Sequence, residues 1–302
     1  MKKRAYIFSV SALALFIITF IIGSMVDESL SEAIFSRNNT FGITCSAIGT
    51  IPGYGILGIL AGGFISVGIK KDKHIAIRIA SFICAALCVG LNIFFSGREF
   101  FGENGFYELH DKLYWLGFVI VTPISGGLAL LGYKIGKDSD NPNLFWILCI
   151  VAFLIFMALI PGVTLLKHFF HRPRYRSVTA YPDITFHNWW QRCTNYETLM
   201  TQYGVLKEEF KSFPSGHAGA CSVVMLFATF LPLINKKYQK WQLPLFIGGL
   251  AWTLLIAFTR ILVGAHFLSD VSMGAMLTML VTVVGYLITT KLKWFKGYLQ
   301  EE

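Results

Sequence analysis

The sequence predicts an all-α fold, a polytopic membrane bundle of about eight transmembrane helices. Hydrophobic residues make up 55% of the 302 residues, and charged residues make up only 14%, whereas a soluble domain carries about 25% charged residues. Apolar runs recur along the chain at a length that crosses a bilayer, which takes about 20 residues in a helix. Residues 1–302 are therefore expected to form a single integral membrane domain in contact with the lipid bilayer.

The apolar runs are continuous and rich in Leu, Ile and Phe, which favours helices over the short alternating strands of a membrane β-barrel. The first run follows the basic start MKKR. It is too long for the apolar part of a cleaved signal peptide, so we expect a retained helix. The eight runs lie at about residues 5–26, 42–69, 75–96, 113–135, 144–166, 219–235, 242–263 and 266–290.

The Lys and Arg residues predict the orientation of the bundle. With the N-terminus inside, the inner segments carry 15 of the 26 Lys and Arg residues, and the outer segments other than 167–218 carry four. This is the positive-inside pattern, so both termini are expected to be cytoplasmic. Since orientation accounts for most of the basic excess, and no basic and aromatic groove is apparent, no nucleic-acid partner is expected. The basic start and short loops favour a bacterial plasma membrane, and the oligomeric state stays open.

Residues 167–218 form the only long segment outside the apolar runs. The segment is too short for an independent domain with a good core, so we expect a cap of loops and a short helix on the outer, extracytoplasmic face. Lys207, Glu208 and Glu209 within it are expected to form a solvated face.

Three polar motifs fall on that same outer face. The first, LKHFFHRPRYR at residues 166–176, places Lys167 and Arg174 seven residues apart at the end of the fifth apolar run. Lys and Arg at a helix end commonly extend toward water as a membrane anchor. They also supply a point charge and a forked donor that suit an anion.

The second motif, KSFPSGHAGA at residues 211–220, opens an apolar run with Pro-Ser-Gly-His. Ser215 suits a helix N-cap, Gly216 allows a ligand to approach the backbone, and the free N–H groups of a helix start bind anions. His217 can exchange a proton near neutral pH. The simpler interpretation is an N-cap with an incidental histidine.

The third motif, FTRILVGAHFLSD at residues 258–270, ends one apolar run at Arg260 and opens the next. His266 and Asp270 are four residues apart, which places them on one face of the expected helix. A carboxylate beside a histidine fixes its tautomer and makes its other nitrogen a better nucleophile. The alternative is a purely structural pair, although ionisable residues at membrane depth are candidates for function.

Together the motifs supply a Lys, several Arg, a helix start, two His and one Asp, which suit a tetrahedral anion. The sequence has no clustered carboxylates for magnesium and no zinc-ligand spacing, so neither a metal nor another cofactor is expected.

These motifs, in this order, resemble the type 2 phosphatidic acid phosphatase (PAP2) superfamily. Its signature is K-x6-R-P, then P-S-G-H, then S-R-x5-H-x3-D. Here Tyr175 replaces the last Pro of the first part and Thr259 replaces the Ser of the third. The motif-bearing part spans 144–290 and belongs to a six-helix core, which leaves the N-terminal helices without an assigned role.

The resemblance implies metal-independent hydrolysis of a lipid phosphate monoester or diphosphate, such as phosphatidate, phosphatidylglycerol phosphate or a polyprenyl diphosphate. His266 would attack phosphorus and form a phosphohistidine, Asp270 would orient His266, and His217 would protonate the leaving oxygen. Two alternatives remain: a lipid phosphotransferase that uses the same histidine, and a non-catalytic lipid-phosphate binder or transporter. The phosphoryl oxygens would be held by Lys167, Arg174, Ser215, the Gly216 N–H and Arg260.

Overall fold

The computed structural model describes residues 2–102, 106 and 109–292, which contain helices and no β-strand. Eight helical segments in these residues are long and apolar enough to cross a membrane, which confirms the predicted polytopic bundle. The helices are α1 (Lys2–Ile34), α2 (Thr40–Ile48), α3 (Ile51–Gly68), α4 (Ile75–Phe100), α5 (His110–Lys137), α6 (Leu144–Met157), the π-helix η2 (Ala158–Thr164), α7 (Leu165–Phe170), α8 (Tyr175–Val178), α9 (Tyr196–Tyr203), η3 (Lys207–Phe210), α10 (Gly216–Ile234), η4 (Lys236–Trp241), α11 (Gln242–Leu262) and α12 (Leu268–Lys291).

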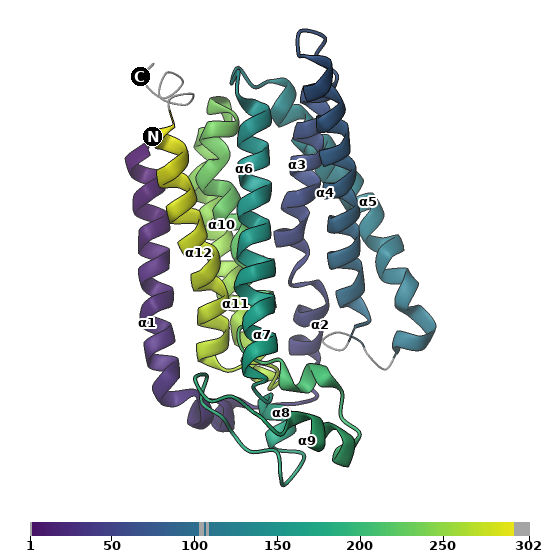
Figure 1. The fold of residues 1–302 in the computed structure, drawn as a ribbon, viewed down its shortest axis with the longest axis vertical. Helices are drawn as coiled ribbons and strands as arrows, with labels where there is room; N and C mark the ends of the chain where they lie inside the picture. Colours follow the sequence, from purple (N-terminus) through teal and green to yellow (C-terminus); the bar gives the residue numbers. More distant parts are fainter. Residues whose placement is uncertain (1, 103–105, 107–108, 293–302) are drawn as a thin grey trace.

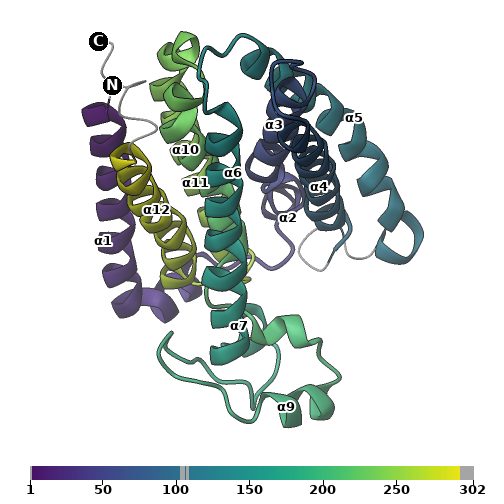
Figure 2. The ribbon, with the colours of Figure 1, turned by 45° about the horizontal axis from the view of Figure 1, so that its top comes forward.

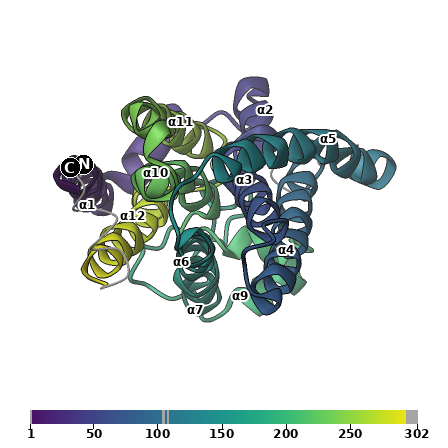
Figure 3. The ribbon, with the colours of Figure 1, turned by 90° about the horizontal axis from the view of Figure 1, so that it is seen from above.

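The long helices run side by side along the longest axis (Figure 1). Helix α1 begins and α12 ends at one end of the bundle, while α7, α8 and α9 lie at the other, which we call the cap end (Figures 1 and 2). Seen from above, α1 and α12 lie on one side of α10, and α3, α4 and α5 lie on the other (Figure 3). In the apolar stretch of α10, 94% of the residues are buried. This is expected for a central helix that is apolar all round.

Two of the expected runs differ from the observed helices. The run 42–69 is divided into α2 and α3 by a break at 49–50, and the first helix continues past residue 26 to Ile34. The extension places Asp27 at the cap end as a buried acidic residue. Both changes bring N-terminal residues to the place where the three motifs converge.

The fifth span is one continuous helical segment with a π-helical turn, Ala158–Thr164, inside it. Pro161 lies in this turn and has no N–H to donate to the helix ladder. A single π-helical turn within an α-helix shifts the backbone hydrogen bonds locally, and such turns are frequent at functional sites. Here the turn lies immediately before α7, which carries Lys167.

The segment between α7 and α10 forms a cap with a small apolar cluster of its own, built on Ile184, Cys193, Leu199 and Phe210. The predicted solvated face is wrong for Glu209, whose side chain is only 16% exposed. Glu209 accepts from both Nε and Nη2 of Arg176 and from the Ser177 hydroxyl. A buried carboxylate needs such partners, and the sequence does not indicate them because they come from a different part of the cap.

Candidate active site

The three motifs converge at the cap end of the bundle. Five of the eight predicted site residues line one cavity of about 780 Å³, where helices α3, α4, α6 and α7 meet the start of α10. The other three, Ser215, Arg260 and Asp270, do not line the cavity and are fully buried. The five lining residues are Lys167, Arg174, Gly216, His217 and His266.

His266 lies in the turn between α11 and α12, not on α12 as the sequence suggested. The turn contains Gly264 at φ +66°, a conformation that favours glycine. A Cβ at this position would meet the ring of Phe35 and the backbone of Arg176. The Arg260 carbonyl accepts from the backbone N–H groups of both Ala265 and His266, at 3.0 and 3.2 Å. The turn therefore gives the imidazole a defined position at the cavity wall.

The tautomer of His266 follows from its partner. Nδ1 lies 2.6 Å from the carbonyl oxygen of Ser212, and a carbonyl can only accept, so Nδ1 carries the proton and Nε2 keeps its lone pair. Burial lowers the pKa of His266 well below its ordinary value, although the Asp270 carboxylate acts in the opposite direction. The ring is therefore neutral near pH 7, the form in which Nε2 is a nucleophile.

Asp270 lies near His266, but its shortest contacts are to other groups. Its Oδ2 is 3.8 Å from His266 Nδ1, longer than a hydrogen bond. The same carboxylate accepts from the Phe267 N–H at 2.8 Å and from the Ser212 hydroxyl, and its Oδ1 accepts from Arg172 Nη1 at 2.6 Å. The expected helix-face pairing is thus replaced: Asp270 caps the start of α12 and positions Ser212, whose carbonyl holds the imidazole.

Arg172 connects this group to the first helix. Its Nη1 also donates to the Ser269 hydroxyl, and its Nη2 donates to Asp27 Oδ2, both at 2.9 Å. The guanidinium carbon lies 4.0 Å from the centre of the Phe267 ring, a cation–π contact. One buried arginine therefore bridges two buried carboxylates, one from α1 and one from α12.

The basic residues of the first motif face the same cavity. Lys167 Nζ donates to the Lys211 carbonyl at 2.8 Å, and the guanidinium of Arg174 lies 4.0 Å from Glu208 and 3.9 Å from Glu209. Burial raises the pKa of Glu209, but Arg174 and Arg176 outweigh this effect and hold it at about 2. The cap thus supplies carboxylates that balance the cationic wall.

The second motif forms the start of α10 as expected. Ser215 is the N-cap, its hydroxyl accepts from the Ala218 N–H at 3.4 Å, and its own N–H donates to the Asp270 carbonyl at 2.9 Å. The first two N–H groups of the helix belong to Gly216 and His217, and both residues line the cavity. A helix start in this position can bind an anion.

Two further contacts come from α2. Arg260 Nη1 donates to the Ser46 hydroxyl, and the Ser46 carbonyl lies 3.1 Å from His217 Nε2. Tyr175, which replaces the Pro of the signature, begins α8 and packs edge-on against Phe35 and Phe267. Aromatic packing therefore occupies the position where the signature has a proline.

A comparison with protein families matches residues 143–294, half of the chain, to the PAP2 superfamily. The chain belongs to the PAP2 superfamily. This PAP2 protein is therefore an enzyme of the phosphatase or pyrophosphatase class. It is 25% identical over 232 residues to the protein named probable diacylglycerol pyrophosphate phosphatase 1 of Schizosaccharomyces pombe, and the alignment covers 70% of this chain and 77% of that protein. No solved structure matches.

The sequence interpretation missed the residues of this PAP2 protein that hold the motifs in place. These residues are Asp27, Ser46, Glu99, Arg172 and Ser212. A usable signal existed for Asp27 and Glu99, since each is an acidic residue at the end of an apolar run, where charge is expensive. Ser46 and Ser212 contact the two histidines through backbone carbonyls, which no side-chain pattern reveals.

Proposed function

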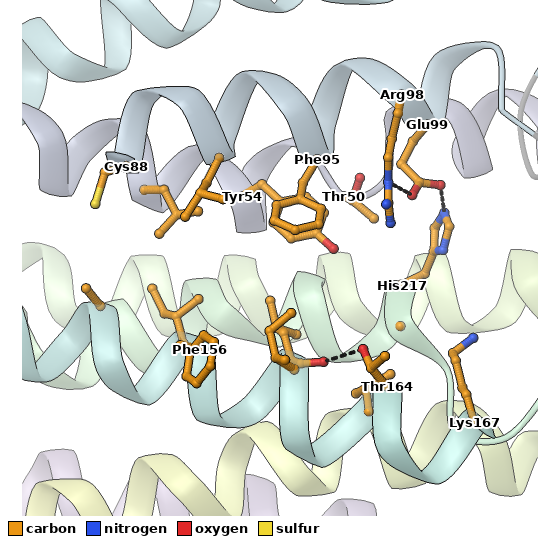
Figure 4. Close-up of a pocket in the computed structure, with 18 of the residues that line it drawn as sticks. Thr50, Tyr54, Cys88, Phe95, Arg98, Glu99, Phe156, Thr164, Lys167 and His217 are labelled. Atoms are coloured by element: carbon orange, nitrogen blue, oxygen red, sulfur yellow. Dashed lines mark hydrogen bonds and ion pairs between the residues drawn. The ribbon is translucent and has the colours of Figure 1, made fainter. Parts of the chain in front are cut away.

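We propose that this protein hydrolyses a lipid phosphate monoester or diphosphate, such as phosphatidate, phosphatidylglycerol phosphate or a polyprenyl diphosphate, through a phosphohistidine intermediate. The observation that carries the proposal is that one cavity has a cationic end and an apolar length (Figure 4). The cationic end carries Lys167 and Arg174, beside the imidazole of His266. The rest is lined by side chains of α3, α4 and α6, among them Leu57, Phe64, Leu87, Leu91, Phe95, Ala152, Ile155 and Phe156.

This composition suits an amphiphilic substrate. A phosphoryl group requires charge-assisted donors, and an acyl or prenyl chain gains about 25 cal/mol for each Å² removed from water. A water-soluble phosphate would use only the polar end. The relative named as a diacylglycerol pyrophosphate phosphatase supports the same substrate class.

The proposed reaction has two displacements. In the first, His266 Nε2 attacks phosphorus, the bond to the leaving oxygen breaks, and His217 protonates that oxygen. In the second, His217 takes a proton from water, the water oxygen attacks phosphorus, and the bond to His266 breaks to release phosphate. Asp270 stabilises the positive charge on His266, while Lys167, Arg174 and the Gly216 N–H, which line the cavity, hold the phosphoryl oxygens. Ser215 and Arg260 are buried behind this wall and support it. Phosphoryl transfer depends mainly on such positioning and electrostatics.

The test uses the purified protein in detergent with a panel of lipid phosphates and diphosphates and no added acceptor. Phosphate release and a labelled phosphohistidine in the acid-quenched wild-type protein are expected. His266→Ala should abolish both and keep a folded protein. His74→Ala, at the start of α4 and away from the cavity, is the matched control. Label that stays on the enzyme without phosphate release, and that moves to an added acceptor alcohol as its phosphate ester, would favour the phosphotransferase instead.

The proposed orientation places the cap end outside a bacterial plasma membrane and both termini inside. The Lys and Arg distribution supports this orientation, since loops at the opposite end carry Lys70, Lys71, Lys236 and Lys237. A cysteine introduced at Glu197 on α9 should react with an impermeant thiol reagent on intact cells, and one introduced at Asp140 should not. The reverse pattern would invert the proposed orientation.

A further inference from the structure

His217 is held by groups that lie outside the matched family segment. Its Nε2 lies 3.1 Å from the Ser46 carbonyl oxygen and 3.6 Å from Glu99 Oε2, and Figure 4 shows Glu99 descending from α4 toward the imidazole. Both neighbours are acceptors, so Nε2 carries a proton. In the described residues no hydrogen bond engages Nδ1 of His217, and Nδ1 is therefore the nitrogen available for proton exchange in the cavity.

Glu99 is itself fixed in place. Its side chain is 12% exposed, and its Oε1 accepts from Arg98 Nε at 3.3 Å. The Arg98 guanidinium lies over the Phe95 ring, 5.0 Å from its centre. The hydrogen bond from Arg98 to Oε1 orients the Glu99 carboxylate, so its other oxygen, Oε2, faces His217.

The charge of Glu99 matters because of the other groups in the cavity. Lys167 and Arg174 line the same cavity as His217, and like charges in a partly desolvated site disfavour a further cation. A carboxylate at 3.6 Å offsets that repulsion and stabilises the imidazolium. At this distance, longer than a hydrogen bond, Glu99 acts on His217 through its charge.

We propose that Glu99 is a positioning residue that fixes the orientation of the His217 ring, so that Nδ1 faces the leaving oxygen, and that offsets the positive charge of the ring while Nδ1 carries the proton. The proposal rests on the proposed function, in which the Nδ1 proton moves to the leaving oxygen as its bond to phosphorus breaks. After that transfer His217 is neutral, and it regains the proton from the attacking water. Glu99 touches neither phosphorus nor the leaving group. It also gives α4, which lies outside residues 143–294, a role in the reaction.

The test compares leaving groups. An alkoxide leaves poorly without a proton, whereas p-nitrophenolate leaves without one, so a defect in the proton donor is seen with the first and not with the second. We expect Glu99→Gln to lower kcat/KM on a long-chain alkyl phosphate by about 100-fold and to change kcat/KM on p-nitrophenyl phosphate by less than about threefold. The comparison uses kcat/KM because this constant reports the first displacement, whereas the second displacement is the same for both substrates. Glu99→Asp keeps the charge on a shorter side chain, so its activity on the long-chain alkyl phosphate should lie between those of Glu99→Gln and wild type.

The second measurement is a double-mutant cycle with His217→Gln. If Glu99 acts through His217, adding Glu99→Gln to the His217→Gln protein should cause little further loss of activity on the long-chain alkyl phosphate. Asp111→Asn, which removes a fully exposed carboxylate from the start of α5, is the charge-matched control and should behave like wild type.

Three outcomes would overturn the proposal. Equal losses of activity on both substrates would make Glu99 a structural residue. So would a double mutant whose loss of activity equals the product of the losses in the two single mutants. Either result leaves the proposed function intact, because wild-type turnover is measured in the same assay. No wild-type turnover on any phosphate ester would instead reject the proposed function, and the role of Glu99 with it.

Discussion

Asp27, in the first helix, forms an ion pair with Arg172 at 2.9 Å, and both side chains are almost completely buried. Asp27 also accepts from the Ser269 N–H at 2.9 Å and from the Ser269 hydroxyl. Removing one partner of a buried pair leaves a charge without compensation. The contact therefore ties α1 to the start of α12, next to the turn that carries His266, although α1 lies outside the matched family segment.

Asp27→Asn should weaken that tie. We expect a loss of about 2 kcal/mol in the free energy of unfolding in detergent, because a charge-assisted hydrogen bond contributes about 1.5–3 kcal/mol and Arg172 keeps Asp270 as a partner. Turnover should fall as well. The neighbouring exposed carboxylate gives the control, and Glu28→Gln should change stability by less than about 0.5 kcal/mol. Equal stabilities of the two variants would contradict the bridging role of Arg172.

Glu209 predicts how the stability of the cap depends on pH. Its pKa is about 2 in the folded protein and 4.5 without the fold, so the unfolded chain binds the proton first as the pH falls. Glu209 therefore stabilises the fold above about pH 4.5, by about 3 kcal/mol, and this contribution disappears as the pH falls toward 2. Glu209→Gln should be less stable than wild type at pH 7, with a difference that shrinks below pH 4.5.

Denaturation in detergent across this pH range checks the prediction for Glu209. Glu197→Gln, on the exposed face of α9, serves as the control because its carboxylate makes no buried ion pair in the described structure. A stability difference for Glu209→Gln that stays constant from pH 7 to pH 3 would show that Arg174 and Arg176 do not hold this carboxylate ionised.

The apolar length of the cavity predicts a chain-length effect. Ala152 lines it from α6, and Ala152→Phe should fill part of it. We expect the KM for a long-chain lipid phosphate to rise at least about tenfold, since burying a few methylene groups contributes about 0.8 kcal/mol each. The kcat/KM for a short-chain phosphate should stay near wild type. Phe153→Trp adds bulk at the next, exposed position outside the cavity and is the control. Equal effects on long and short chains would place the lipid chain elsewhere.

Metal chelation provides a fourth test. In the part of the chain that the structure describes, no group of three or more His, Cys, Asp or Glu side chains is arranged to hold a metal ion. The charge of a phosphoryl group would instead meet Lys167 and Arg174. Because the proposed mechanism uses these basic residues, it predicts that EDTA leaves phosphate release unchanged. A complete loss that only magnesium restores would contradict the metal-independent mechanism.

Local features of the chain were enough to predict the membrane bundle and the candidate residues. Apolar runs predict spans because backbone polar groups in lipid must pair within their own helix. Consecutive spans cross the bilayer in opposite directions, and this alternation predicts that the three motifs lie at one end. At that end the structure brings together, in one cavity, Lys167, Arg174, Gly216, His217 and His266. Ser215 could be assigned as an N-cap because capping depends on a few consecutive residues.

Only the tertiary structure decided which groups hold those residues. His266 and Asp270 are four residues apart, but the turn at Gly264 removes His266 from the helix, and the Ser212 carbonyl becomes its partner. Asp27 and Glu99 reach the site from helices far away in the chain. Such contacts join residues through space, so they depend on how complete helices pack, and the order of residues along the chain does not encode them locally.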